Sequence, residues 1–335
     1  MRVTATAASH ARSDLRPDTL IAFTNRLAKT ARHRQRWARR HGYGAYRVYD
    51  RDVPEFPLAI DCYVPDDAAA GLRVHLQEIE TGWEQTDAEH RDWIAAVRLA
   101  TATALDVPPE SVIAKMRRKR RGQEQHEPTG VRGHEFVIVE SGLRFLVNLE
   151  AYLDTGLFLD HRALRSLVRD RAKGRRMLNL FAYTGSFTVY AAAGGAIASQ
   201  TVDLSNTYLD WAARNFAANG VDSRRHQLIR ADVVRWLETA HDERRRYDLI
   251  VLDPPAFSTS KAMAGALDIQ RDHAALVGSV RGLLAPGGEL YFSTNLRTFR
   301  LDPALARDPA CEDISVRTLP DDFRDRRVHH AFRLT

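Results

Sequence analysis

Apolar side chains recur every three to four residues near the start of the chain, which predicts a helix at residues 18–41. Pro17 and Asp18 provide a start for this helix, and Gly42 and Gly44 provide its end. The remaining faces of the predicted helix are strongly basic. They carry Arg26, Lys29, Arg32, Arg34, Arg36, Arg39 and Arg40.

Short apolar runs bounded by Pro, Gly and Asp follow this helix and predict strands. A single helical pattern interrupts them and stops before Pro108 and Pro109. We expect a small mixed α+β domain at 18–150, preceded by a disordered tail at 1–17. Its predicted strands are 45–49, 58–63, 72–78, 112–117, 136–139 and 143–148, and its second helix is 87–105.

The second half of the chain alternates strands with helices, which is typical of a parallel sheet covered on both faces. Strands are predicted at 177–181, 198–202, 226–230, 248–252 and 289–293, with helices at 186–193 and 206–219. Segments 314–317 and 328–333 are expected to form a closing hairpin. In such an open α/β sheet the ligand lies at the carboxyl ends of the strands.

Composition narrows the class of protein. The chain has 335 residues, 44% of them hydrophobic and 27% charged, which suits two globular domains. Cys62 and Cys311 are its only cysteines, so neither a disulfide framework nor a zinc cluster is expected. No apolar run is long enough to span a membrane, and residues 1–17 lack the apolar core of a secretory signal. We expect a cytoplasmic protein with no membrane partner and no metal.

Basic charge is concentrated in two places. The formal net charge is +6, yet the first 49 residues hold 11 basic side chains and only two acids. A second run at 115–121 is basic at six of seven positions. Such concentrations are typical of phosphate-backbone binding, and a solvated helix face with a basic loop is an equally good interpretation of either run alone. The RNA-binding candidates are Arg26, Arg34, Arg36, Arg40, Lys115, Arg118 and Arg121.

Acidic or glycine-bearing turns follow four successive predicted strands. Gly185 closes the first turn, where a glycine lets backbone approach a ligand. Asp203 follows the second strand and can accept hydrogen bonds from a ribose diol. Asp232 follows the third and suits an exocyclic amine of adenine, and Asp253 opens an Asp-Pro-Pro-Ala-Phe box after the fourth. Each alone is more typical of a helix cap than of a ligand. Together they indicate a nucleoside site.

This series resembles the class I S-adenosylmethionine-dependent methyltransferases. Within them it is similar to the family of ribosomal RNA methyltransferases that includes the RlmK half of the bacterial fusion enzyme RlmKL, which is related to the RlmI-like family. The basic N-terminal helix and residues 46–50 belong to the resemblance, which covers nearly the whole chain. Its motifs are YLDTGLFLDHR at 152–162, NLFAYTG at 179–185, VDLSNTYLDW at 202–211, LDPPAFS at 252–258, QRDH at 270–273 and STNLR at 293–297.

The resemblance implies a fold, a cofactor and a partner. The fold is a Rossmann-like, seven-stranded, mostly parallel sheet with a C-terminal antiparallel hairpin at 151–335. The partner is large-subunit ribosomal RNA or a precursor particle. We expect the N-terminal domain to deliver this substrate to the methyltransferase domain, because we expect no second methyltransferase half. Arg162 is expected to pair with the methionine carboxylate or, alternatively, with Asp160. The implied S-adenosylmethionine site comprises Asp160, Arg162, Phe181, Tyr183, Thr184, Gly185, Asp203, Leu204, Ser205, Asp232 and Asp253.

The methylated atom is constrained by the lack of cysteine at the predicted strand ends. Methylation of cytosine C5 needs a thiolate nucleophile, so that chemistry is disfavoured. A ring nitrogen such as guanine N7 already has a lone pair and needs only alignment with the methyl donor. Exocyclic amines, adenine N6 or guanine N2, remain open from the residues alone, and the resemblance favours 7-methylguanosine.

Under this hypothesis Asp253 and the carbonyls of Pro254 and Pro255 hold the guanine edge. Phe257 stacks on the extruded base or, alternatively, packs in the core. Asn295 and Arg297 read the base or hold its phosphate. Two other classes of function stay open: a non-catalytic RNA-binding assembly factor and a small-molecule methyltransferase.

Overall fold

The computed structural model describes residues 17–79, 86–117, 133–152, 154–258 and 265–335. The predicted tail at 1–17 lies outside these residues except for Pro17, which opens the first helix. Arg118 and Arg121 also lie outside them. The chain forms two compact units, Met1–Lys119 and Arg120–Thr335.

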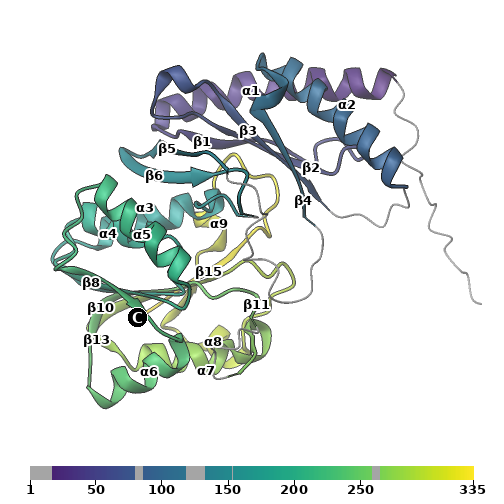
Figure 1. Cartoon of the computed structure of the whole chain (residues 1–335). Helices are drawn as coiled ribbons and strands as arrows, with labels where there is room; N and C mark the ends of the chain where they lie inside the picture. Colours follow the sequence, from purple (N-terminus) through teal and green to yellow (C-terminus); the bar gives the residue numbers. More distant parts are fainter. Residues whose placement is uncertain (1–16, 80–85, 118–132, 153, 259–264) are drawn as a thin grey trace, which may run out of the picture. The chain divides into compact units, whose positions relative to one another are not determined.

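The first unit is a four-stranded sheet with two helices (Figure 1). Neighbouring strands run antiparallel except β3 and β4, which are parallel and are joined through α2. Phe23 and Leu27 of α1 and Trp93 and Val97 of α2 share one buried core with the sheet. The elements are α1 (Pro17–His41), β1 (Ala45–Asp50), β2 (Leu58–Tyr63), η1 (Ala68–Ala70), β3 (Arg73–Ile79), α2 (Asp87–Leu105), η2 (Pro109–Ser111) and β4 (Val112–Arg117).

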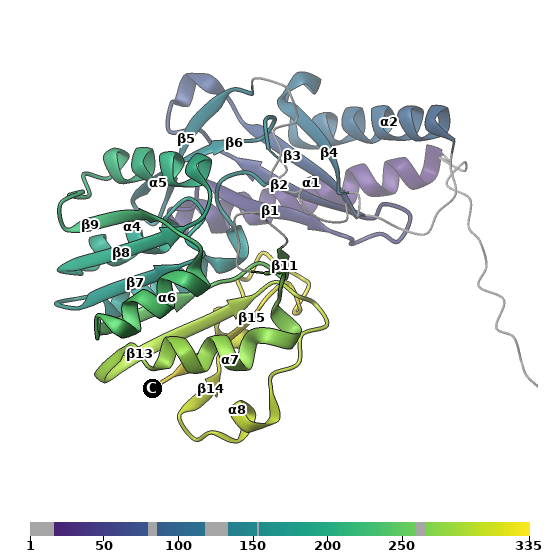
Figure 2. The ribbon, with the colours of Figure 1, turned by 60° about the horizontal axis from the view of Figure 1, so that its bottom comes forward.

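The second unit contains a seven-stranded sheet in the order β14-β15-β13-β10-β7-β8-β9 (Figure 2). Strands β13, β10, β7, β8 and β9 are parallel, and β15 runs antiparallel between β13 and β14. The predicted class I fold is therefore confirmed. The strands are β7 (Arg176–Leu180), β8 (Ala198–Asp203), β9 (His226–Arg230), β10 (Tyr247–Leu252), β13 (Leu284–Thr294), β14 (Cys311–Asp313) and β15 (His330–Leu334).

Helices cover both faces of this sheet (Figure 1). One core packs α6 and α7 against the central strands, and a second core packs α3 and α4 against the opposite face. The near-continuous apolar strands of the sequence are explained by this double burial. The helices are η4 (Leu159–His161), α3 (Arg162–Arg171), α4 (Ser186–Ala193), α5 (Asn206–Ala218), α6 (Val233–Asp242), α7 (Ile269–Arg281), α8 (Pro303–Arg307) and α9 (Ser315–Thr318), and the strands β11 (Phe257–Ser258) and β12 (Leu267–Asp268) form a small ribbon.

The boundary between the units lies at Lys119/Arg120 rather than at the expected residue 150. The hairpin of β5 (Glu135–Glu140) and β6 (Leu143–Asn148) belongs to the second unit because its backbone groups find partners on α5. The amide of Leu146 donates to Asn215 Oδ1 at 2.9 Å, and the indole of Trp211 donates to the Leu146 carbonyl at 3.0 Å. The sequence analysis predicted these two strands and placed them in the first domain.

The closing hairpin also differs from the expectation. Its first strand is β14, which includes Cys311, whereas the expected strand at 314–317 is mostly helix α9. Asp313 accepts hydrogen bonds from the amide and the hydroxyl of Ser315, at 2.9 and 2.6 Å, and such a local side-chain bond competes with an extended chain. Among the described residues, no helix is long and apolar enough to cross a membrane.

Candidate active site

The loop after β7 is held in a strained conformation. Phe181, Tyr183 and Gly185 have φ angles of 55°, 51° and 73°, in the left-handed region that non-glycine residues rarely adopt. A Cβ on Gly185 would lie 2.9 Å from the Phe216 ring, so this position requires glycine. Thr184 is fully buried and donates its hydroxyl to the carbonyl of Gly156 at 2.7 Å. The surroundings therefore enforce the loop geometry.

Asp203 joins this loop to the next one. One carboxylate oxygen accepts from the Tyr183 amide at 2.9 Å and the other from the Ser205 amide at 2.9 Å. Ser205 in turn caps α5 by accepting from the Tyr208 amide at 3.3 Å. Leu204 offers its carbonyl to the Arg230 side chain at 3.4 Å. The predicted residues of these two turns thus form one connected group.

Asp232 caps α6, since its carboxylate accepts from the Arg235 amide at 3.1 Å. It also lines an open cavity of about 540 Å³ with Ile229, Ala231 and Trp236. The sequence analysis gave a helix cap and a contact with the adenine amine as the two possible roles of Asp232, and the cap as the more typical one. The cavity extends from Asp232 along β9 and α6 to Gln227 and Thr239.

Asp253 follows β10 and is contacted from two sides. Its Oδ1 accepts a hydrogen bond of 2.6 Å from the hydroxyl of Ser293, a buried residue of β13. Its Oδ2 lies 3.5 Å from Nδ1 of His161. Pro254 is buried, Pro255 is half-buried, and Phe257 is 51% exposed, so Phe257 does not belong to the core. That exposure leaves its ring face available to a base.

Arg162 does not contact Asp160, contrary to one expectation. Its side chain is 1% exposed and donates to Glu140 and Asp322, each at 3.0 Å. Arg165 donates to the same Glu140 at 2.6 Å. Burial opposes ionisation of Glu140, but the charges of Arg165 and Arg162 outweigh it and lower the pKa of this carboxyl. Arg162 is therefore committed to an internal ion network that anchors β5, and its assignment to the cofactor is corrected.

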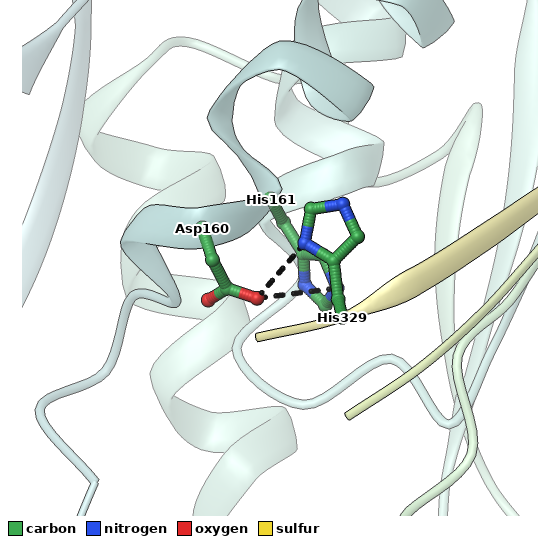
Figure 3. A group of neighbouring side chains, drawn as sticks. All are labelled: Asp160, His161 and His329. Atoms are coloured by element: carbon green, nitrogen blue, oxygen red, sulfur yellow. Dashed lines mark hydrogen bonds and ion pairs between the residues drawn. The ribbon is translucent and has the colours of Figure 1, made fainter. Parts of the chain in front are cut away.

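Asp160 instead pairs with two histidines that the sequence analysis did not single out (Figure 3). Its Oδ2 lies 3.2 Å from Nδ1 of His329 and 3.8 Å from Nε2 of His161. Burial opposes ionisation of Asp160, and contacts with His161 and His329 nevertheless lower its pKa. The adjacency of His161 to Asp160 was the available signal. His329 had none, because it is distant in sequence.

The turns after the parallel strands meet along one edge of the sheet. Register pairs Leu252 with Leu180, and Leu180 with Val202, so the loops of Gly185, Asp203 and Asp253 are neighbours. Asp203 pairs with Arg230 and Leu252 with Phe292, which brings the turns of Asp232 and of Asn295 to the same edge. These turns therefore follow neighbouring strands at the same edge of the sheet.

The residues predicted to contact RNA lie on several different elements. Arg26, Arg36 and Arg40 are exposed on α1, and Arg34 is half-buried with its guanidinium 5.8 Å from the Trp37 ring. The remaining three lie elsewhere: Lys115 is half-buried in β4, Asn295 is exposed, and Arg297 is exposed and ion-paired with Asp325.

Comparison with known proteins agrees with this geometry. Residues 82–327 match the family model described as S-adenosylmethionine-dependent methyltransferase. The chain is 52% identical to ribosomal RNA large subunit methyltransferase K of Neisseria meningitidis serogroup B, over 96% of this chain and 89% of that protein.

Longer relatives and a solved structure extend the comparison. The chain is 50% identical to ribosomal RNA large subunit methyltransferase K/L of Methylococcus capsulatus, over 93% of this chain, and spans 42% of that protein. A crystal structure of SMU.776, a putative methyltransferase complexed with SAH, superposes with a TM-score of 0.74 at 25% identity, covering 94% of this chain and 81% of the other. The chain belongs to the S-adenosylmethionine-dependent methyltransferase family and, within it, to the group of the bacterial ribosomal RNA large subunit methyltransferases K.

Proposed function

We propose that this protein transfers a methyl group from S-adenosylmethionine to N7 of a guanine in large-subunit ribosomal RNA. The substrate class is suggested by the name of the relative that is 52% identical. The observation that carries the choice of site is the Asp253 carboxylate, contacted at both oxygens by Ser293 and His161 at the edge where the parallel strands end.

The residues at the strand ends fit an adenosyl cofactor. The turn that Gly185 closes leads into the first turn of α4, where backbone N–H groups suit the methionine carboxylate, and the half-buried Asp203 suits the ribose diol. Phe181, Tyr183 and Thr184 shape the same turn, while Leu204 and Ser205 flank Asp203. Asp232 suits the adenine amine. When bound, the cofactor supplies an electrophilic methyl group on a positively charged sulfur.

Transfer to N7 needs alignment and charge stabilisation more than proton transfer. The methyl–sulfur bond breaks as a bond to N7 forms, and neutral guanine carries no proton at N7 that would have to leave. Positive charge develops on the base, where the Asp253 carboxylate stabilises it. The carbonyls of Pro254 and Pro255 can accept from the guanine edge, and Phe257, which is 51% exposed, can stack on the base. Asn295 and Arg297 remain candidates for base or phosphate contacts.

An exocyclic amine is the second candidate acceptor, because a carboxylate next to backbone carbonyls also suits the hydrogens of guanine N2 or adenine N6. The two reactions differ in their product. Large-subunit RNA from cells lacking the gene is methylated with labelled cofactor and digested to nucleosides. We expect the label in 7-methylguanosine, and label in N2-methylguanosine or N6-methyladenosine would replace this proposal with the second.

The alternative of a non-catalytic RNA-binding factor is tested by cofactor binding. We expect heat of binding when the folded protein is titrated with S-adenosylhomocysteine. Asp203→Ala should weaken this binding about tenfold or more, since two hydrogen bonds to a charged acceptor are lost. A folded wild-type sample that shows no heat at millimolar ligand would remove the enzymatic proposal.

We further propose that the exposed arginines of α1 bind the RNA backbone. Arg26 is already 3.6 Å from Asp52, so Arg36 and Arg40 are the better candidates within the described residues. Neutralised phosphates release counterions, so the affinity should fall steeply with salt. Arg118 and Arg121 share this proposal on their sequence alone.

A further inference from the structure

His161 lies between two carboxylates within the methyltransferase unit. Its side chain is 5% exposed and belongs to the short helix η4 that precedes α3. Nδ1 is 3.5 Å from Asp253 Oδ2, and Nε2 is 3.8 Å from Asp160 Oδ2. Across the part of the chain that the structure describes, Nε2 has no hydrogen-bond partner although it is buried. Such an atom calls for an explanation, because buried polar groups are nearly always paired.

Asp160 and His329 contact each other next to His161 (Figure 3). His329 Nδ1 lies 3.2 Å from Asp160 Oδ2, and His329 Nε2 lies 3.0 Å from the hydroxyl of Thr318. Thr318 donates that hydroxyl to Ile314 O at 3.0 Å. Asp160 and His329 are thus fixed by the C-terminal segment of the chain. These two side chains are therefore held in place next to the His161 ring.

Apolar rings restrict the orientation of His161. The ring of Phe158 is 6.1 Å away and that of Phe187 is 5.8 Å away, centroid to centroid. The charged or titratable groups that face it from η4, from the turn after β10 and from the segment before β15 are Asp160, Asp253 and His329. Arg162, its neighbour in sequence, turns toward Glu140 and Asp322 instead.

Both ring nitrogens of His161 face a carboxylate oxygen, one of Asp253 and one of Asp160. A ring nitrogen that carries a proton can direct its N–H toward the carboxylate that it faces. The ring is therefore placed to orient an acid of the site.

We propose that His161 is a positioning residue that lies between Asp253 and the Asp160–His329 pair and holds the Asp253 carboxylate in its productive orientation. This inference rests on the proposed methyl transfer. Ser293 donates to Oδ1 of Asp253, and Nδ1 of His161 lies 3.5 Å from Oδ2. The carboxylate is thus approached from both sides.

A bound divalent metal is a different explanation of the same three side chains. Asp160, His161 and His329 each offer a ligand atom, all within 4.8 Å of one another. His329 already contacts Asp160 and Thr318 through its two ring nitrogens, so the place of this side chain is explained without an ion. The test therefore includes a measurement of the metal content of the purified protein.

The test compares His161→Asn and His161→Gln with His226→Asn, which removes a buried imidazole that contacts Ser199 of the neighbouring strand β8. Transfer rate, KM for RNA and the dissociation constant of S-adenosylhomocysteine are measured for each variant. We expect the His161 variants to lose about 10- to 100-fold in kcat, as a misplaced group does, with KM for RNA and cofactor affinity within about threefold. His226→Asn should keep the wild-type kcat.

A readout independent of turnover separates this inference from the proposed substrate. In crystal structures the Asp253 side chain should leave its wild-type orientation in His161→Gln, and an unchanged Asp253 would overturn the proposal whatever the substrate is. Wild-type kcat in His161→Gln would also overturn it. Stoichiometric metal in the purified protein, with activity lost on chelation and restored by the metal, would replace it with the metal site.

Discussion

The hydroxyl of Ser293 donates a hydrogen bond of 2.6 Å to the carboxylate of Asp253. Ser293 is completely buried on β13, and Asp253 follows the neighbouring strand β10. A hydrogen bond to an ionised acceptor is stronger than one between neutral groups. Two adjacent strands therefore cooperate to orient the acid at the centre of the site.

Ser293→Ala should slow methyl transfer about tenfold, because a charged hydrogen bond of roughly 1.5 to 3 kcal/mol is lost. We expect the affinity for S-adenosylhomocysteine to change little. Single-turnover rates with saturating RNA provide the measurement. Ser293→Thr keeps the hydroxyl on the strand and serves as the control, and an alanine variant with the wild-type rate would contradict the role of this bond.

Asp253→Asn should reduce transfer by about 10²- to 10³-fold, which is the usual effect of removing one preorganised electrostatic contact from a transition state. The amide keeps the volume and can still accept from Ser293, so the fold should remain intact. Circular dichroism and thermal unfolding check the fold, and nucleoside analysis checks the product. A variant that methylates at a rate near the wild type would remove Asp253 from the reaction.

Phe257→Ala should raise KM for RNA with almost no change in stability. The ring is 51% exposed, so its removal should alter the free energy of unfolding by no more than about 0.5 kcal/mol. Stacking on a base is worth about 1 to 3 kcal/mol, which corresponds to a loss of roughly 5- to 100-fold in kcat/KM. Phe257→Tyr retains a stacking face and should behave as the wild type. A destabilised alanine variant would instead indicate a packing role.

The elements with a clear period were predicted well from the sequence. Helix α2 and strand β9 have the predicted bounds, since the apolar spacing and, for α2, the stop before Pro108 agree with the fold there. The strand predicted at 314–317 was wrong, because Ser315–Thr318 form the helical turn α9 and the side chain of Asp313 binds Ser315 at its start. A short apolar stretch has no period long enough to distinguish a strand from one helical turn.

The site also contains residues that could be placed from the sequence and one that could not. The turns of Gly185, Asp203 and Asp253 could be expected at one edge because alternating strands and helices predict parallel strands, whose carboxyl ends lie at the same edge of a sheet. Arg162 could not be placed, because its partners Glu140 and Asp322 come from segments 22 residues before it and 160 residues after it in the chain. Contacts of this kind depend on tertiary packing and leave no local pattern.

Reversing the charge of Arg36 and Arg40 together should weaken RNA binding and reduce its salt dependence. Each lost phosphate contact lowers the slope of log affinity against log salt by about 0.7 to 0.9. The matched control is the same reversal of Arg224 and Arg225, two exposed residues of the methyltransferase unit. Filter binding between 50 and 200 mM salt gives the slopes. Equal losses in both pairs would show a general effect of net charge, and loss of cofactor binding would contradict the separate role of α1.

Glu289 should make the stability of the methyltransferase unit depend on pH. Its carboxylate accepts from the Tyr291 hydroxyl at 2.7 Å and lies 3.0 Å from both Arg333 and Arg171. Burial opposes its ionisation, but the Tyr291 hydrogen bond and the arginine charges lower its pKa from 4.5 to about 2. A carboxyl whose pKa is depressed in the folded state stabilises the fold above the unfolded pKa, and this contribution is lost as the pH falls toward the folded pKa.

Glu289→Gln should therefore lower the free energy of unfolding by roughly 2 to 3 kcal/mol at pH 7, and this difference should shrink between about pH 4.5 and pH 2. Urea unfolding at pH 7, 4 and 3 measures it. Glu243→Gln is the matched control, because Glu243 also contacts an arginine but its side chain is 50% exposed, and solvent screens such a pair to within about 0.5 kcal/mol. A Glu289 difference that stays constant from pH 7 to pH 3 would mean that the amide disturbs packing, because only the loss of an ionised group can make the effect vanish in acid.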